Sequence, residues 1–145
     1  MDLTLAPVPQ GGALMTFFCA GVVSGGSTQY LYPGAVNTSC SSASAGTAMQ
    51  PVSFSGTIRN LEVFYVTAPG ATHTDTFTVY KCPALASCAA TTRAITCQIS
   101  GATTPSHCSD TSDAASVSQG DGIQIVDAAG GSSTAANPRV TVQIQ

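Results

Sequence analysis

Polar and apolar residues alternate with a period of two in several short segments, and no segment keeps a helical period long enough to predict a helix. Such alternation places successive side chains on opposite faces of a β-strand. In the segment TIRNLEVFYV, Leu61, Val63 and Tyr65 fall on one face, whereas Phe64 and Val66 fall on the other. The segment therefore predicts a strand with one buried face and a second face that is also apolar.

Further strands follow the same pattern and are separated by turn signals such as Pro-Gly and Gly-Asp-Gly. Phe77 and Val79, for example, share one face of TFTVYKC. Two segments rich in small polar residues, 34–51 and 101–113, are predicted to be loops. About eight strands are expected, which is the number in a jelly roll. The predicted fold class is all-β, an antiparallel β-sandwich of the jelly-roll type. The clearest predicted strands are residues 15–23, 57–66, 76–82, 94–100, 120–126 and 139–145.

The first residues of the chain differ from this pattern. Residues 1–14 contain two prolines and two adjacent glycines, which disfavour regular strand pairing. Leu3, Leu5 and Val8 give this segment apolar side chains. We therefore predict an extended N-terminal arm that docks on a partner, followed by a single β-sandwich domain over residues 15–145.

The composition is unusually poor in charge. Only 8% of the residues are charged, compared with about 25% in typical soluble domains. Charged residues are depleted from the cores of protein interfaces, so a surface of Ser, Thr, Gly and Asn suits a chain that is covered by its own copies or by a partner. On this basis Phe64 and Val66 are predicted to form a subunit interface. The alternatives are a minor core or an edge contact for these two residues and, for the whole chain, a secreted domain with a Thr/Ser-rich surface.

Several classes of function are disfavoured by charge and hydropathy. The net charge is −3, and the four Lys and Arg residues are scattered, so direct binding of nucleic acid through phosphate neutralisation is not expected. No apolar run reaches the ~18 residues of a membrane span. No Lys or Arg precedes Arg59, so the start of the chain does not resemble a signal peptide. We expect synthesis in the cytoplasm of a host cell.

Six cysteines nevertheless suggest disulfides, which form in oxidising surroundings. Release from a lysed host would satisfy both observations. Proximity along the chain favours two pairs and leaves a third, although other pairings and six buried, reduced thiols stay open. The spacing of the last four cysteines does not match the short ligand pairs of structural zinc sites. The candidate pairs are Cys82 with Cys88, Cys97 with Cys108, and Cys19 with Cys40.

Candidate catalytic and metal-binding residues are few. His73 and His107 are the two histidines, and the segment SHCSD around His107 groups His, Cys and Asp. Neighbours in one segment do not form a catalytic triad, whose members meet in space. Glu62 and Asp75 are predicted to be solvated. No catalytic residue, metal ligand or cofactor is predicted. Calcium is not predicted because the dense D-x-D-x-D-G pattern of a calcium loop is missing. The acidic residues considered as calcium ligands were Asp110, Asp113, Asp121 and Asp127.

Residues 50–145 resemble a sequence pattern of small jelly-roll domains in the structural proteins of tailed bacteriophages. The resemblance lies in GTIRNLEVFYVTAPG, DTFTVYKC, ITCQISG, SDAASVSQGDGIQIV and RVTVQI. It implies a capsid decoration (cement) protein on the outer surface of the virion. It also implies a homotrimer whose partner is the major capsid protein. The alternative is a receptor- or glycan-binding module of a tail fibre, tail tip or secreted adhesin, for which Tyr30 and Tyr32 are suggestive aromatic residues. A hydrolase that uses Ser and His107 is the third hypothesis.

Overall fold

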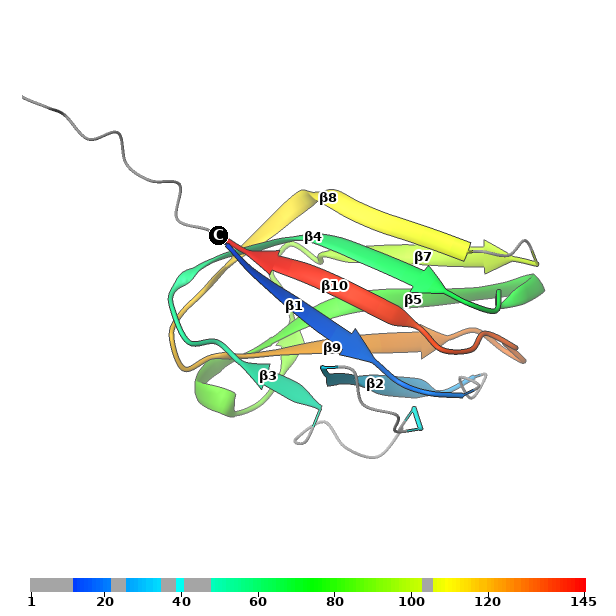
Figure 1. Ribbon diagram of the computed structural model, residues 1–145, viewed down its shortest axis with the longest axis horizontal. Helices are drawn as coiled ribbons and strands as arrows, with labels where there is room; N and C mark the ends of the chain where they lie inside the picture. The colour runs from blue at the N-terminus through cyan, green and yellow to red at the C-terminus, as the bar shows by residue number, and fades with distance from the viewer. Residues whose placement is uncertain (1–11, 22–25, 35–38, 41–47, 103–105) are drawn as a thin grey trace, which may run out of the picture.

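The computed structural model describes residues 12–21, 26–34, 39–40, 48–102 and 106–145. Within these residues the chain forms β-strands and one short 3-10 turn (Figure 1). The predicted all-β fold is confirmed. The elements are β1 (Ala13–Phe18), β2 (Thr28–Pro33), β3 (Met49–Pro51), β4 (Gly56–Tyr65), β5 (Gly70–Cys82), η1 (Pro83–Leu85), β6 (Ala89–Ala90), β7 (Thr96–Gly101), β8 (Ser106–Val117), β9 (Gly122–Ala129) and β10 (Arg139–Ile144).

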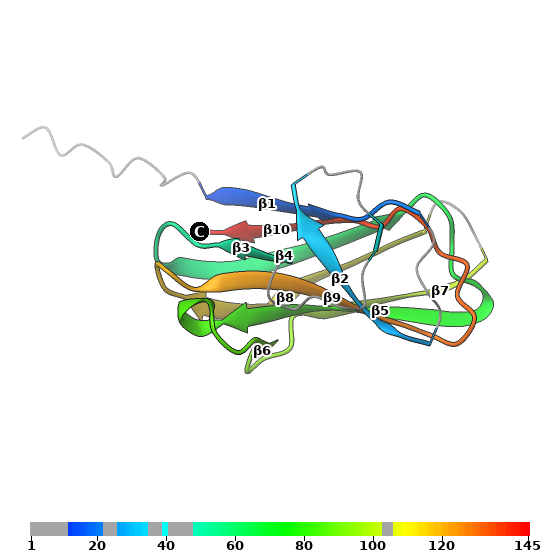
Figure 2. The same cartoon turned by 90° about the horizontal axis from the view of Figure 1, so that it is seen from below.

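The strands form two antiparallel layers. One layer has the order β1-β10-β4-β8, and the other has β2, β9 and β5 side by side, with β3 paired to β9 and with β6 and β7 paired to β5. β2 pairs with both β1 and β9 and runs steeply from one layer to the other (Figure 2). The principal strand orders, β1-β10-β4-β8 and β2-β9-β5-β7, are those of a jelly roll, in which two Greek keys build a sandwich.

The space between the layers is filled by the residues that the period-two pattern assigned to it. Leu61, Val63 and Tyr65 are fully buried on β4, as are Phe77 and Val79 on β5. Burying side chains of this size contributes about 1.5–3 kcal/mol each, so the alternation is the main source of stability. Further core residues at predicted inward positions are Ile95, Cys97, Ile99, Ile123, Ile125, Val140, Val142 and Ile144.

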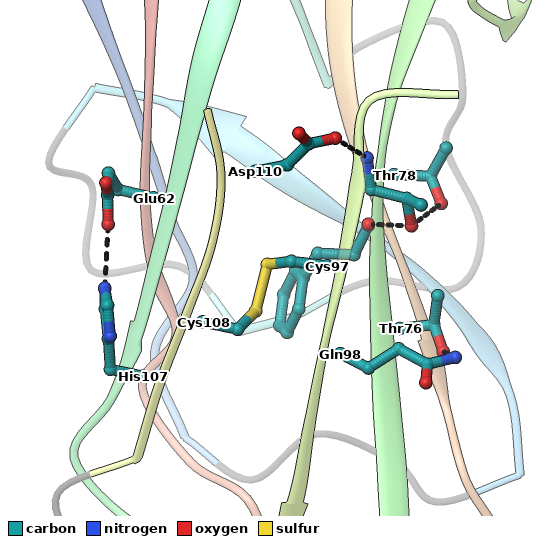
Figure 3. Close-up of a disulfide and its surroundings, with 10 residues drawn as sticks. Glu62, Thr76, Thr78, Cys97, Gln98, His107, Cys108 and Asp110 are labelled. Carbon is teal, nitrogen blue, oxygen red and sulfur yellow. Dashed lines mark hydrogen bonds and ion pairs between the residues drawn. A yellow bond between two sulfur atoms is a disulfide. The ribbon is translucent and has the colours of Figure 1, made fainter. Parts of the chain in front are cut away.

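A disulfide joins the two layers at the side opposite β2. Cys97 on β7 and Cys108 on β8 are bonded, with Cα atoms 5.8 Å apart (Figure 3). These two strands end their respective sheets and have no backbone ladder between them. The backbone N–H of Thr96 donates to Asp110 Oδ2 at 3.1 Å across the same seam. The sandwich is thus closed by covalent and side-chain contacts where strand pairing stops.

The other four cysteines are also paired. Cys19 is bonded to Cys40, and Cys82 is bonded to Cys88 across the turn that contains η1. No free cysteine remains among the six. These are the two pairs that proximity along the chain favoured and the pair that it left, and they leave no thiolate that could bind zinc.

Three boundaries differ from the sequence-based expectations. The segment predicted as a loop over 101–113 contains most of β8. The alternation did not predict this strand, because its inward positions are a cysteine and polar residues rather than aliphatic ones. The predicted loop 34–51 contains β3 at its end. The first strand is Ala13–Phe18 rather than 15–23, so the last two residues assigned to the arm belong to the sheet. Leu3, Leu5 and Val8 lie outside the described residues.

Candidate functional site

Five side chains form a continuous row across the outer face of the β1-β10-β4-β8 sheet. Strand pairing places Tyr32 opposite Phe18, and Phe18 opposite Arg139. It then places Arg139 opposite Phe64, and Phe64 opposite His107. Directly paired residues of antiparallel strands project from the same face of a sheet. We call these five residues the cross-strand row; it extends from β2 to β8 on the side away from the core.

Of the two basic side chains in the cross-strand row, His107 has an acidic partner, whereas Arg139 has none among the described residues. His107 Nε2 lies 2.7 Å from Glu62 Oε2, and both side chains are largely exposed (Figure 3). The guanidinium carbon of Arg139 lies 6.0 Å from the ring centroid of Phe18, at the outer range of a cation–π contact. Within the described part of the chain, no carboxylate is within ion-pairing distance of Arg139. Arg139 is therefore an exposed cation without an acidic partner among the described residues.

A hollow of about 450 Å³ lies next to Arg139. Thr16 and Thr141 are paired across β1 and β10, and they line it together with Phe18 and Gly34. Pockets that bind small molecules have volumes of about 300–1,000 Å³ and combine apolar walls with a few polar groups. An aromatic ring, a guanidinium and two hydroxyl groups fit that description.

Exposed apolar side chains extend this outer face. Phe64 is 38% exposed, Val66 just after β4 is 47% exposed, and Leu14 on β1 is 61% exposed. Their outward orientation follows from the alternation of each strand, and for Phe64 and Val66 it agrees with the face predicted from the sequence. The role of Phe64 and Val66 as a subunit interface stays a prediction.

A polar cluster is buried in the core, directly behind this sheet. The hydroxyl oxygen of Tyr65 lies 2.9 Å from Asp75 Oδ2 and 2.9 Å from Asp127 Oδ2. Ser133 Oγ donates to Asp75 Oδ2 at 2.9 Å, and the backbone N–H of Gly130 donates to Asp75 Oδ1 at 3.1 Å. Both aspartates are fully buried. We call Tyr65, Asp75, Asp127 and Ser133 the buried carboxylate network.

Burial dominates the electrostatics of this network. It raises the pKa of Asp127 to about 8, with a further contribution from the charge of Asp75, while the hydrogen bond with Tyr65 acts in the opposite direction. Burial, followed by the charges of Asp127 and Asp75, also raises the pKa of Tyr65 well above its usual value. The Tyr65 hydroxyl therefore keeps its proton at neutral pH.

The network corrects two expectations. Asp75 was expected to be solvated, but it is fully buried. Asp127 was considered for calcium in a loop, but it lies within β9 and faces the core. A signal for both exists in the sequence, because Asp75 precedes Phe77 and Val79 at the same inward spacing, and Asp127 follows Ile123 and Ile125 in the same way. An aspartate at an inward strand position requires buried partners.

The histidine, cysteine and aspartate of SHCSD do not converge. His107 is exposed on the outer face of β8, whereas Cys108 and Asp110 are buried on the other side (Figure 3). Strand alternation separates them, so they do not form a nucleophile, base and orienting group. His73 lies elsewhere, beside the backbone of Gly70 and Gly131.

Asp110 and Asp121 organise the backbone instead. Asp110 accepts hydrogen bonds from the amides of Thr96, Ser112 and Asp113. Burial raises the pKa of Asp110, but these hydrogen bonds outweigh burial, so the pKa lies below its ordinary value. The pKa of Asp121 is lowered mainly by the amide of Ser118, and its Oδ2 also lies 3.2 Å from Lys81 Nζ. Among the described residues, no group of three or more His, Cys, Asp and Glu side chains is placed to hold a metal ion.

These two depressed pKa values predict a loss of stability in acid. A carboxyl whose pKa is lower in the folded state stabilises the fold above its unfolded pKa, and the contribution is lost as the pH falls through the folded pKa. The melting temperature is therefore expected to drop below about pH 4. Asp110→Asn should lower the melting temperature at pH 6 and should make the drop below pH 4 smaller. Unchanged acid sensitivity in this variant would contradict the role of Asp110.

Comparison of the chain with protein-family models, curated protein sequences and solved structures finds no significant match. In the part of the chain that the structure describes, no helix is long and apolar enough to cross a bilayer. The class of protein that fold and surface together define is a jelly-roll domain with an exposed aromatic and apolar sheet face.

Proposed function

We propose that this protein is a structural component of a virion, a capsid decoration protein that binds other protein through the outer face of the β1-β10-β4-β8 sheet. The observation that carries the proposal is the combination of exposed Phe64, Val66 and Leu14 on a sheet face of a chain with few charges. Apolar surface removed from water contributes about 25 cal/mol per Å² to binding. The jelly-roll topology supports the proposal, because viral capsid domains commonly use it.

The proposed partners are two further copies of the chain, giving a homotrimer, and the major capsid protein of a tailed phage. Phe64 and Val66 would lie between subunits, while Leu3, Leu5 and Val8 of the N-terminal segment would contact the shell. Several weak contacts on one trimer would add avidity. The proposed location is the outer surface of the capsid.

Replacing both Phe64 and Val66 with Ser tests the subunit interface. We expect the protein to stay folded, because both side chains are exposed, and to lose self-association by at least about tenfold in the dissociation constant, because each substitution removes apolar contact area. Sedimentation velocity across a range of concentrations measures the change. Leu85→Ser is the matched control, since Leu85 is equally exposed on η1, away from this sheet. Equal association of both variants would contradict the interface.

Removal of residues 1–11 tests the capsid contact separately. β1 begins at Ala13, so the truncation leaves the strand intact. We expect the truncated protein to keep its melting temperature and oligomeric state but to lose occupancy on capsids, measured by co-sedimentation with purified shells. Full occupancy of the truncated protein would remove the arm from the mechanism.

A second candidate function, glycan binding, is favoured by the hollow beside Arg139. Aromatic rings stack on the apolar faces of sugars, and a guanidinium binds a carboxylate in a bidentate manner. A glycan array that includes acidic sugars distinguishes this function from capsid binding. Specific signals that disappear in Arg139→Ala would favour the receptor-binding alternative; no signal on any glycan would leave capsid decoration as the better proposal.

A further inference from the structure

The buried carboxylate network contains too few hydrogen-bond donors for two ionised aspartates. Its donors are the hydroxyls of Tyr65 and Ser133 and the backbone N–H of Gly130. The last two point to Asp75, and the single Tyr65 proton can be donated to either Asp75 or Asp127, but not to both. If Tyr65 donates to Asp75, the described residues supply no donor to the carboxylate of an ionised, buried Asp127.

A second observation points to the same deficit. Asp127 Oδ1 is buried and has no hydrogen-bond partner among the described residues. Gln29 is paired with Asp127 across β2 and β9, and its buried Oε1 likewise has no partner in the part of the chain that the structure describes. An ionised Asp127 would place negative charge on its unpaired Oδ1, and an unpaired buried charge is far more costly than an unpaired neutral oxygen.

We infer that Asp127 is a proton-binding site: it is held as the neutral acid and donates its proton to the Tyr65 oxygen, while Tyr65 donates to the ionised Asp75. Every short contact in the network then has one proton. The titratable groups that face Asp127 are Tyr65 from β4 and Asp75 from β5, and β2 contributes only the uncharged Gln29. Among the described residues, no Lys, Arg or His is ion-paired with either carboxylate. His73, two residues before Asp75 on β5, lies beside Gly131 in the segment that follows β9.

The network also holds one end of the molecule together. Gly130 and Ser133, which bond Asp75, begin the connection from β9 to β10. Two further backbone amides of this connection donate hydrogen bonds to other segments. The N–H of Thr134 donates to the carbonyl of Pro69, and the N–H of Asn137 donates to the carbonyl of Gly21. Loss of the Asp127 proton places two negative charges on one hydroxyl. We therefore expect residues 130–138 to loosen when Asp127 ionises, which makes the network a pH-sensitive latch.

The proton can be observed directly in the wild-type protein. The ¹³Cγ resonance of Asp127, measured by NMR between pH 4 and pH 10, is expected to titrate near pH 8, which follows from its raised pKa. Titration of Asp127 below pH 5, or a protonated Asp75 in its place, would overturn the assignment.

Asp127→Asn tests the latch, because the amide N–H₂ replaces the donor of the neutral acid. In the wild type, the melting temperature should fall by about 10 °C between pH 5 and pH 9. The variant should lose most of this dependence and should keep slow exchange at the amides of Gly130 and Ala135 above pH 8. Asp113→Asn, on β8 and outside the network, is the matched control and should retain the wild-type slope. Equal slopes in wild type and Asp127→Asn would overturn the latch, as would a calcium-induced rise in the wild-type melting temperature that Asp127→Asn abolishes.

Discussion

Tyr65→Phe is expected to destabilise the protein by about 3–5 kcal/mol at pH 7, the cost of breaking a buried charged network by removing one partner. The ring keeps its place, because its edge contact with Phe77, at 5.4 Å between centroids, does not involve the hydroxyl. Within the described residues, this hydroxyl is the only hydrogen-bond partner of the Asp127 carboxyl group. Its loss leaves one buried acid without an acceptor and Asp75 with one donor fewer. Urea unfolding at pH 7 measures the change.

Tyr80→Phe is the matched control for this experiment. Tyr80 is half-buried at an outward position of β5, and removal of a hydroxyl at such a site should change stability by less than about 0.5 kcal/mol. A double-mutant cycle with Asp127→Asn isolates the contact, since neighbours in one network are not additive. If Tyr65→Phe and Tyr80→Phe cost the same, the buried hydroxyl does not connect the two carboxylates energetically.

Removing the Cys97–Cys108 disulfide by substituting both residues with Ala is expected to cost about 3 kcal/mol, because the bond restricts the unfolded chain. In addition to this global cost, we expect a local loss of protection from amide exchange near the disulfide. This disulfide joins the last strand of each sheet, where no backbone ladder exists. We expect amide exchange in β7 and β8 to accelerate more than exchange in β9 and β10. Native-state hydrogen exchange measures this pattern.

The Cys82–Cys88 pair supplies the control. Its six-residue separation lies within one turn, so replacing both residues with Ala should cost about 2 kcal/mol and should leave exchange in β7 and β8 unchanged. Uniform acceleration across both sheets in the Cys97 and Cys108 variant would show that the disulfide stabilises the fold globally rather than closing the seam.

The raised pKa of Asp127 and the lowered pKa values of Asp110 and Asp121 together predict that the protein is most stable in mild acid. Asp127 has a raised pKa, so its contribution is complete below its unfolded pKa and is lost as the pH rises toward about 8. Asp110 and Asp121 have lowered pKa values, so their contributions are lost in stronger acid. The protein should therefore be most stable near pH 4–5, which lies between the two losses.

The candidate surface could be predicted only in part. Phe64 and Val66 were placed on the outer face because alternation along one strand determines the direction of each side chain. Arg139 and Phe18 were not recognised, because they become neighbours only when β1 and β10, the first and last strands, pair. The paired hydroxyls of Thr16 and Thr141 depend on the same long-range contact.

The sequence by itself determined the all-β class, the inward face of most strands and a disulfide pattern based on proximity. The physical reason is that a period of two and short cysteine separations are local properties, which the chain carries wherever it folds. The tertiary structure alone decided that SHCSDTSDAASV is a strand. Its inward positions are satisfied by a disulfide to β7 and by the hydrogen bonds of Asp110, partners that lie outside the segment. It also decided that Asp75 and Asp127 share Tyr65, because three strands must pack before their side chains meet.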